Sequence, residues 1–317
     1  MRVVISEFMD APAVARLAER FDTHFDPALV DRPDDLLAAL AEAHALIVRN
    51  RTRVDAQLLA RAPRLRAVGR LGVGLDNIDV EACRARGIAV IPATGANAQA
   101  VAEYVVCAAM MLLRGAFRAS GEVAAGQWPR ARLAAGREAA GKTLGLIGFG
   151  DIGRLAARLA RGLGMNIVAH DPAVDPRLAL LAELGVRLLP LEELLATADV
   201  VSLHVPLTPA TRGMLDGARL ALMKPGAVLI NTARGGIVDE RGLARLLADG
   251  RLGAAALDVF QDEPLPPRSP LADVPNLLLT PHIAGLTQES NRRVSELVAR
   301  RIIETLAGDS HAAAPAG

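Results

Sequence analysis

The segment 143–171 constrains the fold of this chain more than any other segment. A short apolar run, 144–147, is followed by three glycines at a fixed spacing, Gly148, Gly150 and Gly153. The next residues place leucines at helical spacing, and a second apolar run, 167–169, leads to Asp171. Strand, glycine turn, helix, strand and acidic residue follow one another in the order that binds a dinucleotide.

Each glycine of this segment has a separate physical role in a dinucleotide site. Gly148 permits the tight turn, Gly150 lets the backbone approach a pyrophosphate, and Gly153 lets the helix pack closely on the strand. The helix that follows begins with free N–H groups, which favour a phosphate. Asp171 is placed to accept both ribose hydroxyls and to repel a 2′-phosphate, so the pattern favours NAD over NADP. The alternative, in which the glycines serve turns only, is disfavoured by the flanking strands and the spaced acid.

The composition argues against several other classes of protein. The formal net charge is +1 and aromatic residues make up 3% of the chain, so nothing indicates a nucleic-acid partner. The longest apolar run, 104–113, is about half of a membrane span, and no signal-peptide core is present, so no membrane segment is expected. The histidines and cysteines show no ligand spacing, so no metal site is predicted. Cys83 and Cys107 are interpreted as structural thiols of a reduced, cytoplasmic protein.

The alternation of strand-like and helix-like segments predicts an α/β fold with two domains. Residues 1–97 carry their own strand and helix signals and form a small α/β domain. After Asp171, four more strand-like runs complete a doubly wound parallel sheet with the first two. These runs are 199–203, 227–230, 253–259 and 277–279. The segment 97–114 is a helix that is apolar nearly all round, which predicts burial in the core or against another subunit. Residues 307–317 are expected to form a disordered tail.

Four motifs spread over nearly the whole chain resemble the D-isomer-specific 2-hydroxyacid dehydrogenase family. They are VGRLGVGLDNIDV from Val68, TLGLIGFGDIG from Thr143, INTARGGIVDE from Ile230, and the pair LDVFQDEPLP from Leu257 and TPHIAG up to Gly285. The resemblance implies two Rossmann-like domains, with an NAD-binding domain at 98–284 inserted into a smaller, discontinuous substrate domain at 1–97 and 285–317. It also implies a homodimer formed through the helix 97–114. One departure is His-Ile-Ala-Gly at 282–285, where the family usually reads His-Ile-Gly-Ala.

The resemblance further implies a catalytic set of Arg234, Glu263 and His282 for hydride transfer between NAD and a D-configured 2-hydroxy acid. His282 would remove the hydroxyl proton, since histidine exchanges protons near neutral pH. Glu263 would orient His282 and stabilise its cation, and Arg234 would bind the substrate carboxylate with two parallel hydrogen bonds. Asp258 would face the nicotinamide amide. The positions matched to the NAD site are Gly148, Gly150, Asp151, Ile152, Gly153, Asp171, Val205, Ala233, Asp258 and Gly285.

Arginines in the loops of the first domain indicate which acid is bound. The predicted substrate-binding residues there are Arg49, Arg51, Arg70, Leu71 and Gly72. This many arginines indicate a second anionic group on the substrate, at C3. The alternative is that they are solvated surface residues of an arginine-rich chain.

Five segments are most similar to the (S)-3-sulfolactate dehydrogenase branch of the family. They are ISEFMD at Ile5, VRNRTRVD at Val48, GRLGVGLDNIDVEACRA at Gly69, PATGAN at Pro92 and PHIAG at Pro281. The predicted reaction is the oxidation of (S)-3-sulfolactate, which has the spatial arrangement of a D-hydroxy acid, to 3-sulfopyruvate. The alternatives are a short D-3-phosphoglycerate dehydrogenase without a regulatory domain, another D-2-hydroxyacid dehydrogenase, and an NAD-sensing corepressor. The last is disfavoured because the chain has no long interaction extensions.

Overall fold

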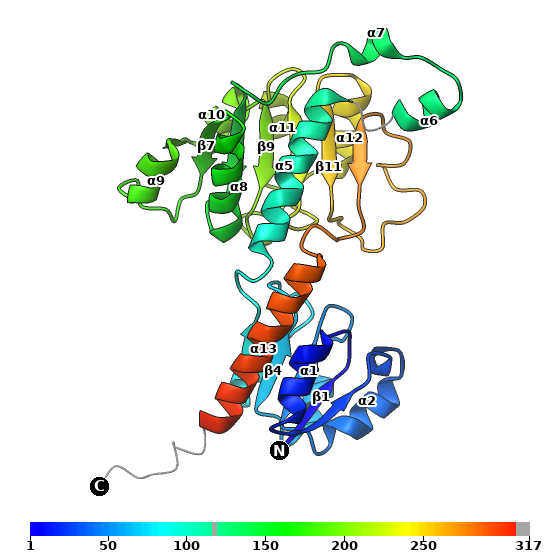
Figure 1. The fold of residues 1–317 in the computed structure, drawn as a ribbon, viewed down its shortest axis with the longest axis vertical. Coiled ribbons are helices and arrows are strands. Elements are labelled where there is room, and N and C mark those ends of the chain that lie inside the picture. Colours follow the sequence, from blue (N-terminus) through cyan, green and yellow to red (C-terminus); the bar gives the residue numbers. More distant parts are fainter. Residues whose placement is uncertain (116–118, 309–317) are drawn as a thin grey trace. The chain divides into compact units, whose positions relative to one another are not determined.

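A computed structural model of the chain describes residues 1–115 and 119–308 and divides the chain into two compact units. Unit 1 comprises Met1–Asn97 and Leu286–Gly317, and unit 2 comprises Ala98–Gly285 (Figure 1). Gly285 thus groups with unit 2, one residue beyond the predicted boundary. Of the expected tail, residues 309–317 lie outside the described residues. Residues 307 and 308 instead continue the last helix, α13 (Gln288–Gly308).

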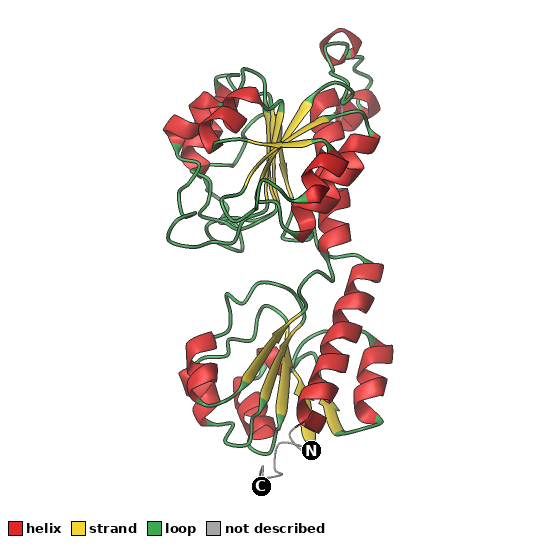
Figure 2. Cartoon of the chain, turned by 90° about the vertical axis from the view of Figure 1, so that its left-hand side faces the viewer, coloured by secondary structure: helices red, strands yellow, loops and turns green. Residues whose placement is uncertain are grey.

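The described residues of unit 1 form a five-stranded parallel sheet in the order β2-β1-β3-β4-β5. The strands are β1 (Arg2–Ile5), β2 (Asp22–Phe25), β3 (Ala45–Val48), β4 (Ala67–Arg70) and β5 (Ala89–Pro92). The helices are α1 (Ala11–Ala18), α2 (Pro33–Leu40), α3 (Ala56–Ala60), α4 (Val80–Ala85) and α13, with a 3₁₀ turn, η1 (Leu29–Asp31). Figure 2 shows helices on both faces of the sheet. The apolar side chains of α1 and α13 pack on one face and those of α2, α3 and α4 on the other.

The order of strands in unit 1 reverses between β1 and β3, and loops at such a switch point commonly bind ligands. Glu7 follows β1 and is only 4% exposed. Its carboxylate accepts hydrogen bonds at 2.9–3.2 Å from the backbone N–H groups of the loop after β3, namely Arg49, Asn50, Arg51 and Thr52. Burial alone would raise the pKa of Glu7, but these bonds outweigh it and lower that pKa. The loop that carries two of the predicted substrate arginines is therefore fixed by one buried carboxylate.

We expect Glu7→Gln to lower the stability of the protein at neutral pH by about 2 kcal/mol, because buried N–H donors lose a charged acceptor. A carboxylate whose pKa is lowered on folding stabilises the protein above its unfolded pKa, near 4.5. That stability is lost as the pH falls through the folded pKa. In urea titrations, the difference between wild type and variant should shrink below about pH 4.5. Glu42→Gln, which removes a surface partner of Arg64, is the control. A difference that stays constant down to acid pH would contradict the assignment.

The described residues of unit 2 form a seven-stranded parallel sheet in the order β12-β11-β10-β9-β6-β7-β8. The strands are β6 (Thr143–Ile147), β7 (Asn166–His170), β8 (Val186–Leu188), β9 (Val200–Leu203), β10 (Val228–Asn231), β11 (Ala254–Leu257) and β12 (Leu277–Leu279). The helices are α5 (Ala98–Arg114), α6 (Ala119–Ala124), α7 (Arg130–Leu133), α8 (Asp151–Gly162), α9 (Ala179–Leu184), α10 (Leu191–Thr197), α11 (Gly217–Leu222) and α12 (Glu240–Ala248). The doubly wound parallel sheet is confirmed, and its edge strand β8 was not predicted.

The helices of unit 2 form two layers, one on each face of its sheet (Figure 2). The side chains of α5, α8 and α9 pack against one face, and those of α10, α11 and α12 pack against the other. The predicted all-round apolar helix corresponds to α5, which buries one side while Met110 and Cys107 stay exposed. The short helices α6 and α7 bury no residue. No helix within residues 1–115 and 119–308 is both long and apolar enough to span a membrane.

Candidate active site

The glycine turn after β6 leaves space where a dinucleotide requires it. Gly148 has φ +98°, and a Cβ there would lie 2.8 Å from the backbone carbonyl of His204. A Cβ at Gly153 would lie 2.4 Å from the carbonyl oxygen of Gly148. A Cβ at Gly150, in contrast, would meet nothing within 4 Å. The packing of the turn thus explains two of the glycines, and the third borders open space at the start of α8, as expected for a bound pyrophosphate.

Asp171, directly after β7, connects the glycine turn to the second strand. Its Oδ2 accepts the N–H of Phe149 at 2.8 Å, and its Oδ1 accepts the N–H of Ala173 at 2.9 Å. Each carboxylate oxygen has a further lone pair for a ribose hydroxyl. The two residues that begin α8, Asp151 and Ile152, lie beside this turn, and no side chain caps the helix at Gly150. The residues present therefore fit an NAD molecule.

His204 is a residue of this site that the sequence argument did not select. It follows β9, next to β6 at the switch point of the sheet, and it lies against Gly148 and Gly153. Burial lowers the pKa of His204 to about 4, so the ring is neutral near pH 7. Neither ring nitrogen has a hydrogen-bond partner within the described part of the chain. The next residue, the predicted Val205, also lies against the glycine turn, since a Cβ at Gly148 would be 3.1 Å from the side chain of Val205. A neutral donor and acceptor therefore lines the glycine turn.

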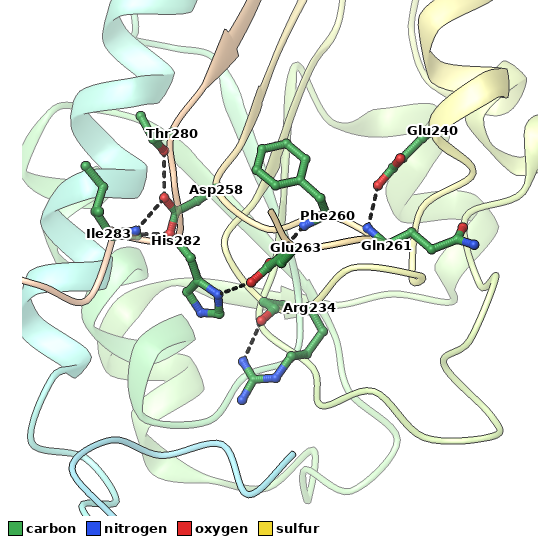
Figure 3. A network of polar contacts seen from close by, with 11 residues as sticks. Arg234, Glu240, Asp258, Phe260, Gln261, Glu263, Thr280, His282 and Ile283 are labelled. Atoms are coloured by element: carbon green, nitrogen blue, oxygen red, sulfur yellow. Dashed lines mark hydrogen bonds and ion pairs between the residues drawn. The ribbon is translucent and has the colours of Figure 1, made fainter. Parts of the chain in front are cut away.

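The predicted acid–base pair comes together in unit 2, in the loops that follow β11 and β12 (Figure 3). His282 Nδ1 lies 2.8 Å from Glu263 Oε2, and Glu263 Oε1 accepts the N–H of Phe260 at 3.0 Å. Glu240, at the start of α12, accepts the N–H of Gln261 at 2.8 Å and holds the same loop. The carboxylate therefore fixes one ring nitrogen of His282 and leaves Nε2 for another partner.

Arg234 lies at the end of the neighbouring strand β10, in a turn that Asn231 organises. Asn231 Oδ1 accepts the N–H of Ala233 at 3.0 Å, and its Nδ2 donates to the carbonyl oxygen of Arg234 at 3.0 Å. The guanidinium of Arg234 donates to the carbonyl oxygen of Ala233 at 2.6 Å. Figure 3 shows the side chains of Arg234, Glu263 and His282, which come from the segments that follow the adjacent strands β10, β11 and β12. A cationic donor, Arg234, and a proton acceptor, His282, thus both lie on the side of the sheet where the carboxyl ends of the strands are.

Asp258 is 1% exposed, and its carboxylate is hydrogen-bonded to residues close to His282 in the sequence. Its carboxylate accepts the hydroxyl of Thr280 at 2.6 Å and the N–H groups of Ile283 and Ala284, both at 2.8 Å. These residues flank His282 on both sides. Its predicted position facing the nicotinamide amide stays a prediction, whereas its contacts with the loop that carries His282 are present in the structure.

The predicted substrate residues of unit 1 lie at the carboxyl ends of β3 and β4. Arg49 donates to Asn291 Oδ1 at 2.8 Å, and its guanidinium lies 5.5 Å from the centre of the Phe8 ring. Arg51 pairs with Asp31 at the surface, so part of its charge is compensated. Arg70 donates to the carbonyl oxygen of Leu71 at 2.9 Å and folds across Gly72. Arg49 is accordingly positioned by two contacts within unit 1, to the side chains of Asn291 and Phe8.

The chain is similar to several known proteins. Residues 106–284 match the family model described as the D-isomer specific 2-hydroxyacid dehydrogenase, NAD binding domain. The (S)-sulfolactate dehydrogenase of Chromohalobacter salexigens is 58% identical over 92% of this chain and 94% of that protein. The D-3-phosphoglycerate dehydrogenase of Mycobacterium tuberculosis is 41% identical over 97% of this chain but 57% of that protein. The structure of D-lactate dehydrogenase from Aquifex aeolicus, complexed with NAD and lactic acid, matches with a TM-score of 0.83, at 28% identity over 100% of both chains.

Proposed function

The chain belongs to the D-isomer specific 2-hydroxyacid dehydrogenase family, and from this membership we propose that it oxidises (S)-3-sulfolactate to 3-sulfopyruvate with NAD⁺. It is an NAD-dependent oxidoreductase of 2-hydroxy acids, as the predicted fold and motifs indicated. The proposal of this substrate is carried by the 58% identity to an (S)-sulfolactate dehydrogenase over 94% of that protein. The identity to the phosphoglycerate enzyme is lower, at 41%, and the chain spans little more than half of it.

The proposed catalytic residues divide the chemistry among three side chains. His282 accepts the proton of the substrate hydroxyl at Nε2 as C2 gives up its hydride, since Nδ1 faces Glu263. Glu263 holds the ring in this orientation and stabilises the imidazolium that forms. Arg234 binds the substrate carboxylate through its guanidinium and fixes C2 next to His282. When bound at the glycine turn, NAD⁺ supplies the hydride acceptor.

We propose that residues of unit 1 bind the anionic group on C3 of the substrate. Arg49 and Arg51 follow β3, Arg70 is the last residue of β4, and Leu71 and Gly72 come directly after it. A sulfonate carries one full negative charge and three acceptor oxygens, which suit guanidinium donors. Because Arg49 is held by Asn291 and by the loop that Glu7 fixes, it loses little side-chain freedom on binding.

A panel of four acids tests the substrate. Initial rates of NADH formation are measured with (S)-3-sulfolactate, D-3-phosphoglycerate, D-glycerate and D-lactate, each at several concentrations. The expected result is the highest kcat/KM for sulfolactate, with a loss of about 10²-fold for the acids that lack an anionic C3 group. Turnover of phosphoglycerate with no activity on sulfolactate would replace the proposed substrate by the second candidate. A protein that binds NADH but turns over none of the acids would instead favour a binding function.

The preference for NAD is proposed to depend on Asp171. Asp171→Asn keeps the size of the side chain and removes the charge that repels a 2′-phosphate. We expect a rise of about tenfold in the KM for NAD⁺ and a fall of about 10²-fold in the preference for NAD⁺ over NADP⁺. Asp175→Asn neutralises a surface carboxylate paired with Arg177 and serves as the control. An unchanged ratio of kcat/KM for the two cofactors in Asp171→Asn would refute this role.

A homodimer is proposed through the surface of α5. Its exposed side carries Met110, 43% exposed, and Cys107, and the nearby helices α6 and α7 bury nothing in their own chain. Trp128, between those helices, is 78% exposed. Apolar side chains of this kind are commonly covered in an oligomer. Light scattering after gel filtration should give twice the mass of one chain, and Met110→Glu should reduce the measured mass to that of one chain.

We also propose a cytoplasmic location, because the thiols of Cys83 and Cys107 are free.

A further inference from the structure

We propose that Tyr104 and Thr280 are positioning residues for His282 and act on it through Asp258. Tyr104 OH lies 2.6 Å from Thr280 Oγ1, which in turn lies 2.6 Å from Asp258 Oδ1. Asp258 then accepts the backbone N–H group of Ile283 (Figure 3) and that of Ala284. This inference rests on the proposed catalytic role of His282, and it gives a positioning role to two side chains outside the proposed catalytic set.

The backbone of His282 explains why such a network is needed. His282 has φ +55°, in the left-handed region that non-glycine residues adopt at a cost in energy. Its own N–H donates to the carbonyl oxygen of Thr280 at 3.0 Å, which closes a tight turn. The carboxylate of Asp258 accepts the hydroxyl of Thr280, the first residue of this turn, and the N–H groups of the two residues that follow the turn. The left-handed conformation is therefore held from both sides.

The direction of the hydrogen bonds follows from the chemistry of the three side chains. An ionised carboxylate only accepts, so Thr280 gives its single hydroxyl proton to Asp258. Thr280 Oγ1 must then accept from Tyr104, whose phenol is its donor. Burial raises the pKa of Tyr104, which keeps the phenol protonated and able to donate. Each bond polarises the next, so the bond between Tyr104 and Thr280 strengthens the hold of Thr280 on Asp258.

Two separate anchors thus act on His282. Glu263 fixes the ring through Nδ1, whereas Asp258 fixes the backbone from which the ring projects. The bond to Glu263 alone leaves the ring free to shift with its turn. A general base must lie within hydrogen-bond reach of the proton that it removes, and a misplacement of about 1 Å reduces the rate by up to about 10²-fold. Loosening the backbone anchor should therefore slow the chemical step more than it weakens binding.

Three variants test the network. Thr280→Val keeps the shape and removes the hydroxyl, Thr280→Ser keeps the hydroxyl, and Tyr104→Phe removes only the phenol oxygen. We expect Thr280→Val to lower kcat by about tenfold to 10²-fold, Tyr104→Phe by about threefold to tenfold, and Thr280→Ser by less than about threefold. The dissociation constant of NADH, measured by fluorescence titration, should stay within about twofold of wild type. Thr23→Val removes a hydroxyl in β2 of unit 1 and is the matched control.

A second readout needs no substrate. The backbone amide signals of Ile283 and Ala284 in NMR spectra of the unliganded full-length protein should move in Thr280→Val and stay in place in Thr280→Ser. Unchanged kcat and unchanged amide signals in Thr280→Val would overturn the inference, and so would equal losses in the Ser and Val variants. If Thr280→Val does not fold, Tyr104→Phe decides by the same criteria. If the wild type oxidises none of the acids, the proposed function fails while the amide signals still decide on the network.

Discussion

Replacing His282 by asparagine is expected to lower kcat by about 10³-fold. General acid–base catalysis contributes about 10²- to 10⁴-fold, and asparagine cannot take up the hydroxyl proton. Asparagine is chosen because it tolerates the left-handed conformation that His282 adopts at φ +55°. Its side-chain amide also keeps a donor for Glu263 Oε2, which His282 Nδ1 contacts at 2.8 Å. The substitution therefore removes the base and retains the turn.

The controls for His282→Asn separate catalysis from binding and folding. The dissociation constant of NADH and the melting temperature should match those of wild type, because the glycine turn lies at other strands, β6 and β7. Glu263→Gln should give a smaller loss, of about 10- to 10²-fold, since the base is kept but its orientation and its cation are less stabilised. Turnover by His282→Asn at more than about one tenth of the wild-type rate would assign the proton transfer to another group.

The second large effect is expected for Arg234→Gln. A bidentate contact between a guanidinium and a carboxylate comprises two charge-assisted hydrogen bonds, each of about 1.5 to 3 kcal/mol. Their loss should lower kcat/KM for every 2-hydroxy acid by about 10²- to 10⁴-fold. The loss should fall mainly on KM if the carboxylate is bound equally in ground and transition states. Steady-state kinetics with both sulfolactate and its 2-oxo product measure this directly.

The matched control for Arg234→Gln is Arg212→Gln. The side chain of Arg212 lies close to Gly236, which is two residues after Arg234. Arg212 has no proposed contact with the substrate. Its replacement should leave kcat/KM within about threefold of wild type. Normal turnover by Arg234→Gln, or an equal loss in both variants, would show that the carboxylate is bound elsewhere.

Much of the fold could be predicted because its signals are local. The strand, glycine turn, helix and Asp171 follow one another within 143–171, and each later strand of unit 2 other than β8 is a short apolar run. Two strands were missed for physical reasons. The strand β2 reads Asp-Thr-His-Phe and buries none of these residues, and β8 has three residues of which only Val186 is buried. Both lie at sheet edges, where pairing with a neighbour replaces the apolar pattern.

The candidate site likewise has a part that the sequence predicts and a part that it does not. Arg234, Glu263 and His282 follow strands and stand in specific motifs, so they could be named before the structure. The hydrogen bonds that hold the loops of the site could not be predicted, because they join residues that are far apart in the sequence. Glu7 accepts N–H groups more than 40 residues away, and Tyr104 pairs with Thr280 across 176 residues. The burial of His204 likewise depends on packing against the glycine turn, which no sequence period reveals.

The proposed oxidation of (S)-3-sulfolactate is tested most directly by the rate of NADH formation from each enantiomer of 3-sulfolactate, measured separately with the purified protein and NAD⁺. We expect turnover of the S enantiomer, which has the spatial arrangement of a D-hydroxy acid, and a kcat/KM lower by at least about 10³-fold for the R enantiomer. His282→Asn should abolish most of the activity on the S enantiomer in the same assay. Preference for the R enantiomer, or no turnover of either one alongside efficient oxidation of D-3-phosphoglycerate, would contradict it.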